Sequence, residues 1–178
     1  MSFPIIETKR IILRELEEKD SLSLFSVFSN TQAMKYWDSS CHTNISTTMK
    51  FLEKMRRSFQ NEQGISWGIV LKASNELIGQ ISFHSLSSCK SEGQLGYIIS
   101  PRHWGYGIGD EVLSAIIIFG FNVFGLKEIF AEIDPDNLPS ISIIEKHGFE
   151  LIEFRENDLI IDGESHNTNL YRLANGYV

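Results

Sequence analysis

The segment with the clearest chemical potential is a glycine-rich loop, Trp104-Gly105-Tyr106-Gly107-Ile108-Gly109-Asp110, which follows an apolar strand and opens a long apolar helix. Its three glycines allow positive φ angles and let a ligand approach the backbone closely. The first turn of the helix offers backbone N–H groups without intrahelical partners, at the positive end of the helix dipole. Together these groups predict an anion site suited to phosphate or pyrophosphate, with Arg102 or a lysine as a counter-charge.

Two common phosphate-binding patterns do not fit this loop. A Walker loop requires Gly-Lys-Ser/Thr, whereas Gly109 is followed by Asp110-Glu111. The dinucleotide fingerprint requires a third glycine where Asp110 stands, and an earlier βαβ context. The alternative is a glycine-rich helix entry that binds nothing. The position between a strand and a buried helix favours a ligand site.

Hydrophobic periodicity predicts the elements that position the loop. We expect a single domain spanning residues 1–178. Helices are expected from caps at Asp20 and Ser46, the second ending at Gly64. Further helices are predicted over 107–124 and 138–147, and strands over 9–16, 65–72, 76–84, 93–100, 127–133, 149–154 and 166–173. Strands gathered ahead of a βαβ-like centre indicate one mixed α+β sheet.

Length and composition exclude several classes of protein. The 178 residues, 42% hydrophobic and 22% charged, are typical of one globular domain. The longest apolar stretch, 112–126, is shorter than the ~18 residues that span a bilayer, and no signal peptide is evident. Cys41 and Cys89 form no CxxC pair and the five histidines lack metal-ligand spacing. We therefore expect a cytoplasmic protein without a metal site.

The charge is distributed unevenly. The net charge is −7, and the half after residue 89 carries 6 basic and 14 acidic residues, a net of −8. An acidic surface repels nucleic acid and attracts cationic partners such as amines, which excludes a general nucleic-acid binder. The alternative is a solvated acidic face that serves solubility.

Further segments accompany the glycine loop in a fixed order. They are Thr8-Lys9-Arg10-Ile11-Ile12-Leu13-Arg14, Leu77-Ile78-Gly79, Gly96-Tyr97, Asn137-Leu138-Pro139-Ser140 with Glu145-Lys146-His147-Gly148-Phe149, and Tyr171-Arg172-Leu173 after Asp162-Gly163. This series resembles the GNAT family of acyl-CoA-dependent N-acetyltransferases, whose pyrophosphate loop is Gln/Arg-x-x-Gly-x-Gly/Ala. The tryptophan in the first loop position resembles the branch that contains bacterial ribosomal-protein N-terminal acetyltransferases.

The resemblance implies a fold and a cofactor. The fold would be α+β (α/β/α), with a mixed, mostly antiparallel seven-stranded sheet and about four helices. The fourth and fifth strands, 93–100 and 127–133, would splay apart to admit acetyl-CoA. The backbones of Ile98 and Ile99 would pair with the pantetheine arm, as an added strand does. The loop N–H groups would hold the pyrophosphate, and Asn137, Ser140 and Lys146 would add cofactor contacts.

The resemblance also implies direct acetyl transfer from acetyl-CoA to a primary amine. The Ile99 N–H would polarise the thioester carbonyl. Ser140 would protonate the leaving thiolate, because Ile144 stands where many members carry a tyrosine. No general base is assigned, since Leu159 and Gln94 occupy the family's glutamate positions. A protein N-terminal α-amine is the leading substrate. Alternatives are a small amine such as a polyamine or aminoglycoside, or a non-catalytic acyl-CoA-binding or sensing module; a homodimer stays open.

Overall fold

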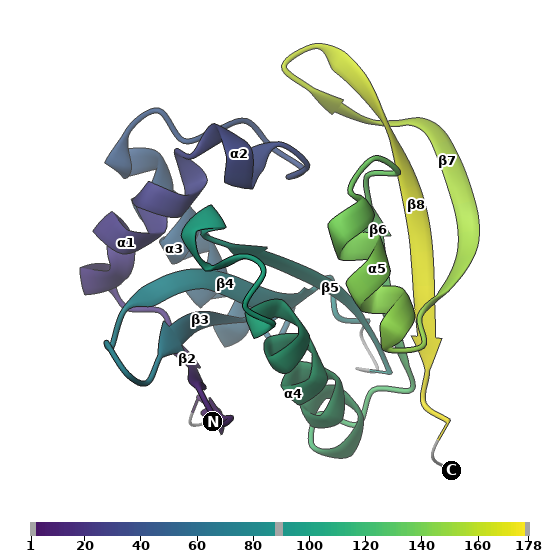
Figure 1. Cartoon of the computed structure of the whole chain (residues 1–178), viewed down its shortest axis with the longest axis horizontal. Helices are drawn as coiled ribbons and strands as arrows, with labels where there is room; N and C mark the ends of the chain where they lie inside the picture. Colours follow the sequence, from purple (N-terminus) through teal and green to yellow (C-terminus); the bar gives the residue numbers. More distant parts are fainter. Residues whose placement is uncertain (1–2, 88–90, 177–178) are drawn as a thin grey trace.

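The computed structural model describes residues 3–87 and 91–176, which form a single mixed sheet with helices on both faces (Figure 1). Within these residues the sheet has eight strands in the order β1-β2-β3-β4-β5-β6-β8-β7. The strands are β1 (Ile6–Glu7), β2 (Ile11–Glu15), β3 (Ile65–Leu71), β4 (Leu77–His84), β5 (Glu92–Ile99), β6 (Glu128–Ile133), β7 (Glu150–Ile161) and β8 (Glu164–Ala174). The helices are η1 (Glu18–Asp20), α1 (Ser21–Phe28), α2 (Thr31–Met34), α3 (Ile45–Gln60), η2 (Pro101–His103), α4 (Ile108–Asn122) and α5 (Leu138–Lys146).

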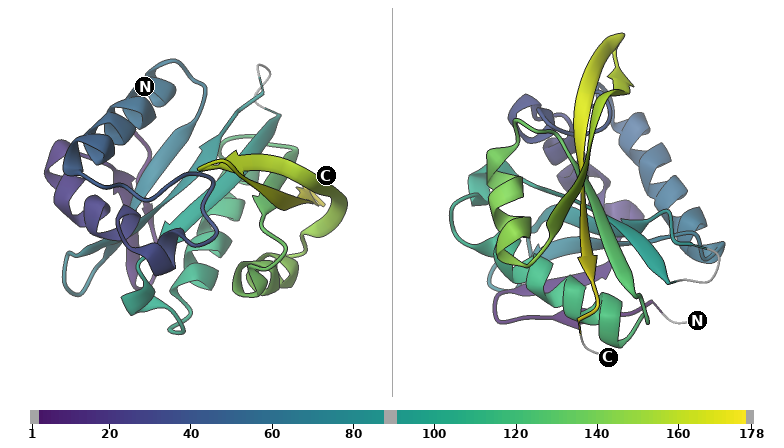
Figure 2. Two further views of the ribbon diagram at one scale, coloured as in Figure 1. Left: turned by 90° about the horizontal axis from the view of Figure 1, so that it is seen from above. Right: turned by 90° about the vertical axis from the view of Figure 1, so that its right-hand side faces the viewer.

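The central strands are buried on both faces. Helices α4 and α5 cover one face, and α1 and α3 cover the other (Figure 2). A large cluster around Trp67, Phe83 and Ile116 packs beneath α4, whereas a smaller one around Phe28 packs beneath α1. Burial on both faces explains why β3 is a nearly continuous apolar run rather than an alternating one.

All strand pairs are antiparallel except one, β5 with β6. These two strands pair in parallel over three residues only, Glu92–Gln94 against Glu128–Phe130. Beyond residue 94, β5 runs on to Ile99 paired only with β4. The backbone on the other side of this segment is therefore available to a ligand, as expected for splayed fourth and fifth family strands.

The mixed α+β sheet is confirmed, and several details differ from expectation. The eighth strand is β1, two residues that pair with β2 and carry too little pattern to detect. Asn44, not Ser46, caps α3, because its side chain accepts the Thr47 N–H. The carboxylate of Asp20 binds Arg14 Nη1 and Nη2 at 2.7 and 2.8 Å rather than capping α1.

Strand β7 also exceeds its expected length, because it continues to Ile161 along β8. Cys89 lies outside the described residues. Within the described part of the chain, no helix is long and apolar enough to cross a membrane.

Candidate active site

The glycine loop lies between the end of β5 and the start of α4. Gly105 and Gly107 have φ angles of +79° and +72°, in the left-handed region where a side chain is strained. Gly107 is the N-cap residue of α4, so the loop ends directly on the free N–H groups of the first helical turn. Gly109 lies where α4 meets its neighbours: a Cβ there would lie 3.5 Å from Ile143 and 3.8 Å from Ile99. The loop predicted to bind an anion therefore lies at the tip of β5.

Trp104 fixes this loop to the strand. Its indole Nε1 donates a hydrogen bond of 2.8 Å to the carbonyl oxygen of Ile99. The Ser100 N–H donates to Ile78 O in β4 at 2.8 Å. Antiparallel strands alternate the direction of their backbone groups, so the N–H and C=O of Ile99 point away from β4. Since Trp104 occupies the carbonyl, the Ile99 N–H is the group left to a ligand.

Ile98 has the opposite orientation. Its register partner is Gln80 in β4, and its side chain belongs to the core cluster beneath α1. The glycine of the Leu-Ile-Gly segment has a steric role here, because a Cβ at Gly79 would lie 2.1 Å from Ile98 O. Of the two residues expected to pair with a pantetheine arm, Ile99 is therefore the one whose backbone faces away from β4.

Arg10 is the cation that the sequence did not indicate for this loop. Its Nη1 donates to Tyr106 O at 2.7 Å, and its Nε donates to Glu111 at 2.6 Å. The backbone N–H of Arg10 and the hydroxyl of Thr8 bind the same carboxylate at 2.8 and 2.5 Å. The turn between β1 and β2 thus supports the loop from about a hundred residues away. Arg102, the cation expected from sequence, is exposed on η2.

Lys146, at the end of α5, forms an ion pair with Asp110 in the first turn of α4. Its Nζ lies 2.8 Å from both oxygens of Asp110, and His147 Nε2 lies 3.1 Å from Oδ1 of the same carboxylate. The hydrogen bond from Lys146, followed by the charges of Lys146 and His147, lowers the pKa of Asp110. The ammonium of Lys146 and the imidazole of His147 therefore lie beside the first turn of the helix, both bound to one carboxylate.

Asn137 and Ser140 begin α5. Asn137 is the N-cap, and its Oδ1 accepts the Ser140 N–H at 3.4 Å. The hydroxyl of Ser140 accepts a hydrogen bond of 3.2 Å from the hydroxyl of Tyr97 in β5. Burial raises the pKa of Tyr97, while the hydrogen bond with Ser140 opposes that rise. The serine thus lies against the side of β5 that also carries Ile99.

The residues at the family's acid and base positions supply neither group. Ile144 is fully buried in the main core, so α5 presents a packing residue there. Leu159 lies in β7, and Gln94 lies in β5 opposite His84. Burial lowers the pKa of His84, with the nearby carboxylates of Asp38 and Glu132 opposing the shift.

A cavity lies on the face of the sheet opposite α4, where β5 and β6 begin to separate. Gln94 and Glu132 line it, and each alternates along its strand with residues that face α4. Its volume is about 270 Å³. Arg155 reaches it from β7 and pairs with Glu132 and Glu153 at 2.9 Å each. The cavity is lined by Ser85, Glu92, Gly93, Gln94, Phe130, Glu132, Arg155 and Leu170.

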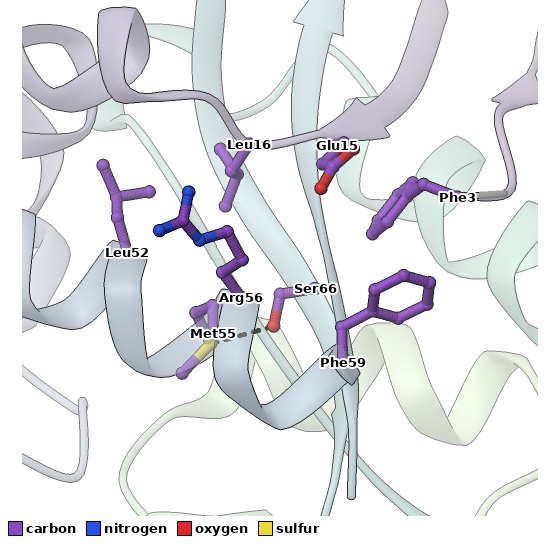
Figure 3. A pocket seen from close by; sticks show the side chains of 8 residues that line it. All are labelled: Phe3, Glu15, Leu16, Leu52, Met55, Arg56, Phe59 and Ser66. Carbon is purple, nitrogen blue, oxygen red and sulfur yellow. Dashed lines mark hydrogen bonds between the residues drawn. The ribbon is translucent and has the colours of Figure 1, made fainter. Parts of the chain in front are cut away.

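Another cavity, between α3 and the N-terminal strands, belongs to the packing rather than to the site. Its volume is about 10 Å³, room for one water at most. The side chains around it include Phe3, Phe59 and Met55, and Ser66 donates to the sulfur of Met55 (Figure 3). Among the described residues, no group of three or more His, Cys, Asp and Glu side chains could hold a metal ion.

Comparison with known proteins gives a family match over most of the sequence. Residues 10–150 match the Acetyltransferase (GNAT) domain. The chain is 33% identical over 172 residues to the "Uncharacterized N-acetyltransferase YoaA" of Bacillus subtilis, and the alignment covers 97% of each protein.

Two solved structures share the fold. The first is RimL, a ribosomal L7/L12 alpha-N-protein acetyltransferase, with a TM-score of 0.87, 19% identity and coverage of 98% of this chain and 96% of the other. The second is the Microcin C7 self immunity acetyltransferase MccE, solved with acetyl-CoA and AMP. Its TM-score is 0.83, its identity is 21%, and 94% of each chain is covered.

Proposed function

The chain belongs to the GNAT family of acetyltransferases, and on that premise we propose that it moves an acetyl group from acetyl-CoA directly to a primary amine. The observation that carries the proposal is the continuity of β5 and the loop. The strand ends at Ile99 with its N–H turned away from β4, and two left-handed glycines then lead into the N-terminus of α4. One ligand with a thioester, an amide-bearing arm and a pyrophosphate fits these groups in that order.

The residues present suit the phosphate end of such a ligand. From Gly105 to Asp110 the loop offers backbone N–H groups and the helix dipole, which bind an anion without side-chain charge. The Trp104 N–H, expected from sequence among these donors, is instead bonded to Pro101 O at 3.2 Å. Lys146 and His147 lie beside it, and the Lys146 ammonium, released from Asp110, would add a positive charge. Backbone donors explain how a chain half with a net charge of −8 can hold a polyanion.

The chemical step would be divided among three groups. The Ile99 N–H would donate to the thioester carbonyl oxygen, where negative charge develops. The nitrogen of a neutral amine attacks the carbonyl carbon, so that a C–N bond forms and the C–S bond breaks. Ser140 would give its hydroxyl proton to the departing sulfur. Asn137 would hold the arm with the amide nitrogen that its capping role leaves free.

A protein N-terminal α-amine is the substrate that the site supports best. The pKa of a free α-amine is ~7.7–8.0, whereas that of lysine is ~10.4, so an α-amine needs little help to lose its proton. Gln94 and Leu159 place no carboxylate at the family's base positions. The likeness to RimL, which is named for acetylation of a protein α-amine, supports the same substrate class.

The test is a thiol-release assay with acetyl-CoA and a panel of amines. The panel contains peptides with free N-termini and varied first residues, the same peptides with blocked N-termini and a free lysine, a polyamine and an aminoglycoside. We expect turnover of free α-amines and none of the blocked peptides. Turnover of the polyamine or aminoglycoside alone would reassign the substrate to a small amine.

Binding of acetyl-CoA, measured separately, resolves the remaining outcomes. At 100 times Kd, acetyl-CoA should stabilise the fold by ~2.7 kcal/mol. That stabilisation without turnover of any amine would make the protein an acyl-CoA-binding or sensing module. If acetyl-CoA causes no stabilisation and no amine is turned over, the proposal is contradicted altogether.

A further inference from the structure

Tyr97 and Ser140 are joined across two elements that are far apart in the chain. The phenol oxygen of Tyr97, in β5, lies 3.2 Å from Ser140 Oγ at the start of α5. The ring packs against the core beneath α4, so its hydroxyl has a fixed position. Two residues further along the same strand is Ile99, whose backbone groups have the same orientation as those of Tyr97. The pair therefore lies two residues along β5 from the Ile99 N–H, to which the thioester carbonyl is assigned.

When a serine accepts a hydrogen bond from a tyrosine, both the direction of its own hydrogen and the stability of its oxygen after proton loss change. Ser140 Oγ carries one hydrogen, and an aliphatic hydroxyl is a far weaker acid than a phenol or a thiol. When Tyr97 donates to the oxygen, the serine hydrogen must point elsewhere. Negative charge that develops on the oxygen, as this hydrogen leaves, is stabilised by the phenol O–H.

We propose that Tyr97 is a positioning residue for acetyl transfer: its hydroxyl orients Ser140 and supports the oxygen of Ser140 while the serine proton passes to the leaving sulfur. This inference rests on the proposed function. As the C–S bond breaks, its electron pair goes to sulfur, which takes the Ser140 proton. Ser140 Oγ then takes the Tyr97 proton, and the phenolate is reprotonated from solvent. The amine nitrogen loses its surplus proton to solvent, so the protons balance.

The experiment compares Tyr97→Phe, Ser140→Ala and the double variant with the wild type, using an amine that the panel identifies. Tyr97→Phe should lower kcat about 5- to 10-fold, the scale of one lost hydrogen bond, with KM for acetyl-CoA unchanged. Ser140→Ala should lower kcat about 100-fold or more, as for loss of a general acid. In the Ser140→Ala background, Tyr97→Phe should cost nothing further, because its partner is gone.

Tyr171→Phe is the matched control. Tyr171 is a buried tyrosine on β8 whose hydroxyl lies 3.5 Å from Glu145 Oε1, on the same helix as Ser140. Its loss removes an equivalent oxygen beside α5 and should leave kcat within about twofold of wild type. A fall in kcat equal to that of Tyr97→Phe would mean that any hydroxyl holding α5 has the same effect, and would overturn the proposal.

A second readout needs neither substrate. In protein labelled at tyrosine ¹³Cζ, the resonance absent from Tyr97→Phe belongs to Tyr97. That resonance should move in Ser140→Ala and stay in place in Tyr171→Phe, since only the first removes its partner. An unmoved resonance, or losses in kcat that add independently in the double variant, would overturn the role of Tyr97 alone. A wild type that acetylates no amine would instead overturn the proposed function, and this inference with it.

Discussion

Lys146 and Asp110 face each other beside the first turn of α4, with the ammonium nitrogen 2.8 Å from both carboxylate oxygens. An anionic ligand at the helix N-terminus would therefore lie beside an ammonium and a carboxylate whose charges cancel. Both side chains are partly exposed, so the pair itself contributes little to stability.

Replacement of Asp110 should improve cofactor binding. Asp110→Asn removes a negative charge from the anion site and frees Lys146, so Kd for acetyl-CoA should fall about 2- to 5-fold. Lys146→Ala leaves Asp110 less neutralised and should raise Kd by a similar factor. Isothermal titration at two salt concentrations measures both effects. Lys50→Ala, on the exposed side of α3, is the charge control and should change neither Kd. Weaker binding by Asp110→Asn would contradict this assignment.

The left-handed glycine at the N-cap should be required for binding as well as for folding. Gly107→Ala places a Cβ in a strained conformation and should lower the free energy of unfolding by ~1–2 kcal/mol. It should also weaken acetyl-CoA binding, because the strained residue shifts the N–H groups beside it. Gly125→Ala is the matched control, since Gly125 has φ +78° with nothing within 4 Å of the new Cβ, and lies beyond the far end of α4. Equal losses of affinity in both variants would mean that the loop geometry does not matter to binding.

Salt should affect the two substrates differently. The acidic half of the chain attracts a cationic amine, while acetyl-CoA is held mainly by backbone donors. Raising ionic strength from 0.05 to ~0.5 M shortens the screening length severalfold, so KM for the amine should rise more than KM for acetyl-CoA. Steady-state kinetics across that range checks this. A larger rise for acetyl-CoA would instead place side-chain cations such as Lys146 in control of cofactor binding.

His42 should make the fold sensitive to mild acid. Its ring stacks on Phe28 at 4.8 Å, its Nδ1 lies 2.8 Å from Thr48 Oγ1, and burial lowers its pKa. Below its ordinary value of 6.5, the unfolded chain binds a proton that the folded chain resists. The free energy of unfolding should therefore fall as pH drops from about 7 toward the lowered value.

Urea unfolding of the wild type and of His42→Asn at pH 7.5, 6 and 5 tests this. The variant should be less stable at pH 7.5 but should lose less stability on acidification. Some pH dependence should remain, since burial also lowers the pKa of His84. An unchanged pH dependence in the variant would show that His42 has the same pKa in the folded and the unfolded chain.

Much of the arrangement could be predicted from the sequence because it depends on local pattern. The change from helical to strand periodicity located the sheet, and the glycine spacing located the loop at the tip of β5. The choice between Asn44 and Ser46 as cap could not be predicted, since both residue types cap well and lie within two positions. The extent of β7 was missed because most of its side chains are exposed and show no alternation.

The partners of the site could not be predicted, because they are tertiary contacts. Arg10 meets Tyr106 across 96 residues, and Tyr97 meets Ser140 across 43. Each residue stood in a segment of family resemblance, yet nothing in its spacing indicated its partner. The ion pair between Lys146 and Asp110 could not be predicted either, because two residues 36 positions apart on different helices have no periodic relation in the sequence.

The ties from Thr8 and Arg10 to Glu111 bear on how the protein can be trimmed or fused. A chain cut back to the residues that match the family, 10–150, would lose Thr8 along with the hairpin of β7 and β8. A bulky tag joined close to Thr8 would press on the same contact. Tags are therefore better attached beyond Asn175, whose N–H donates to Lys127 O at 2.8 Å, than close to Thr8.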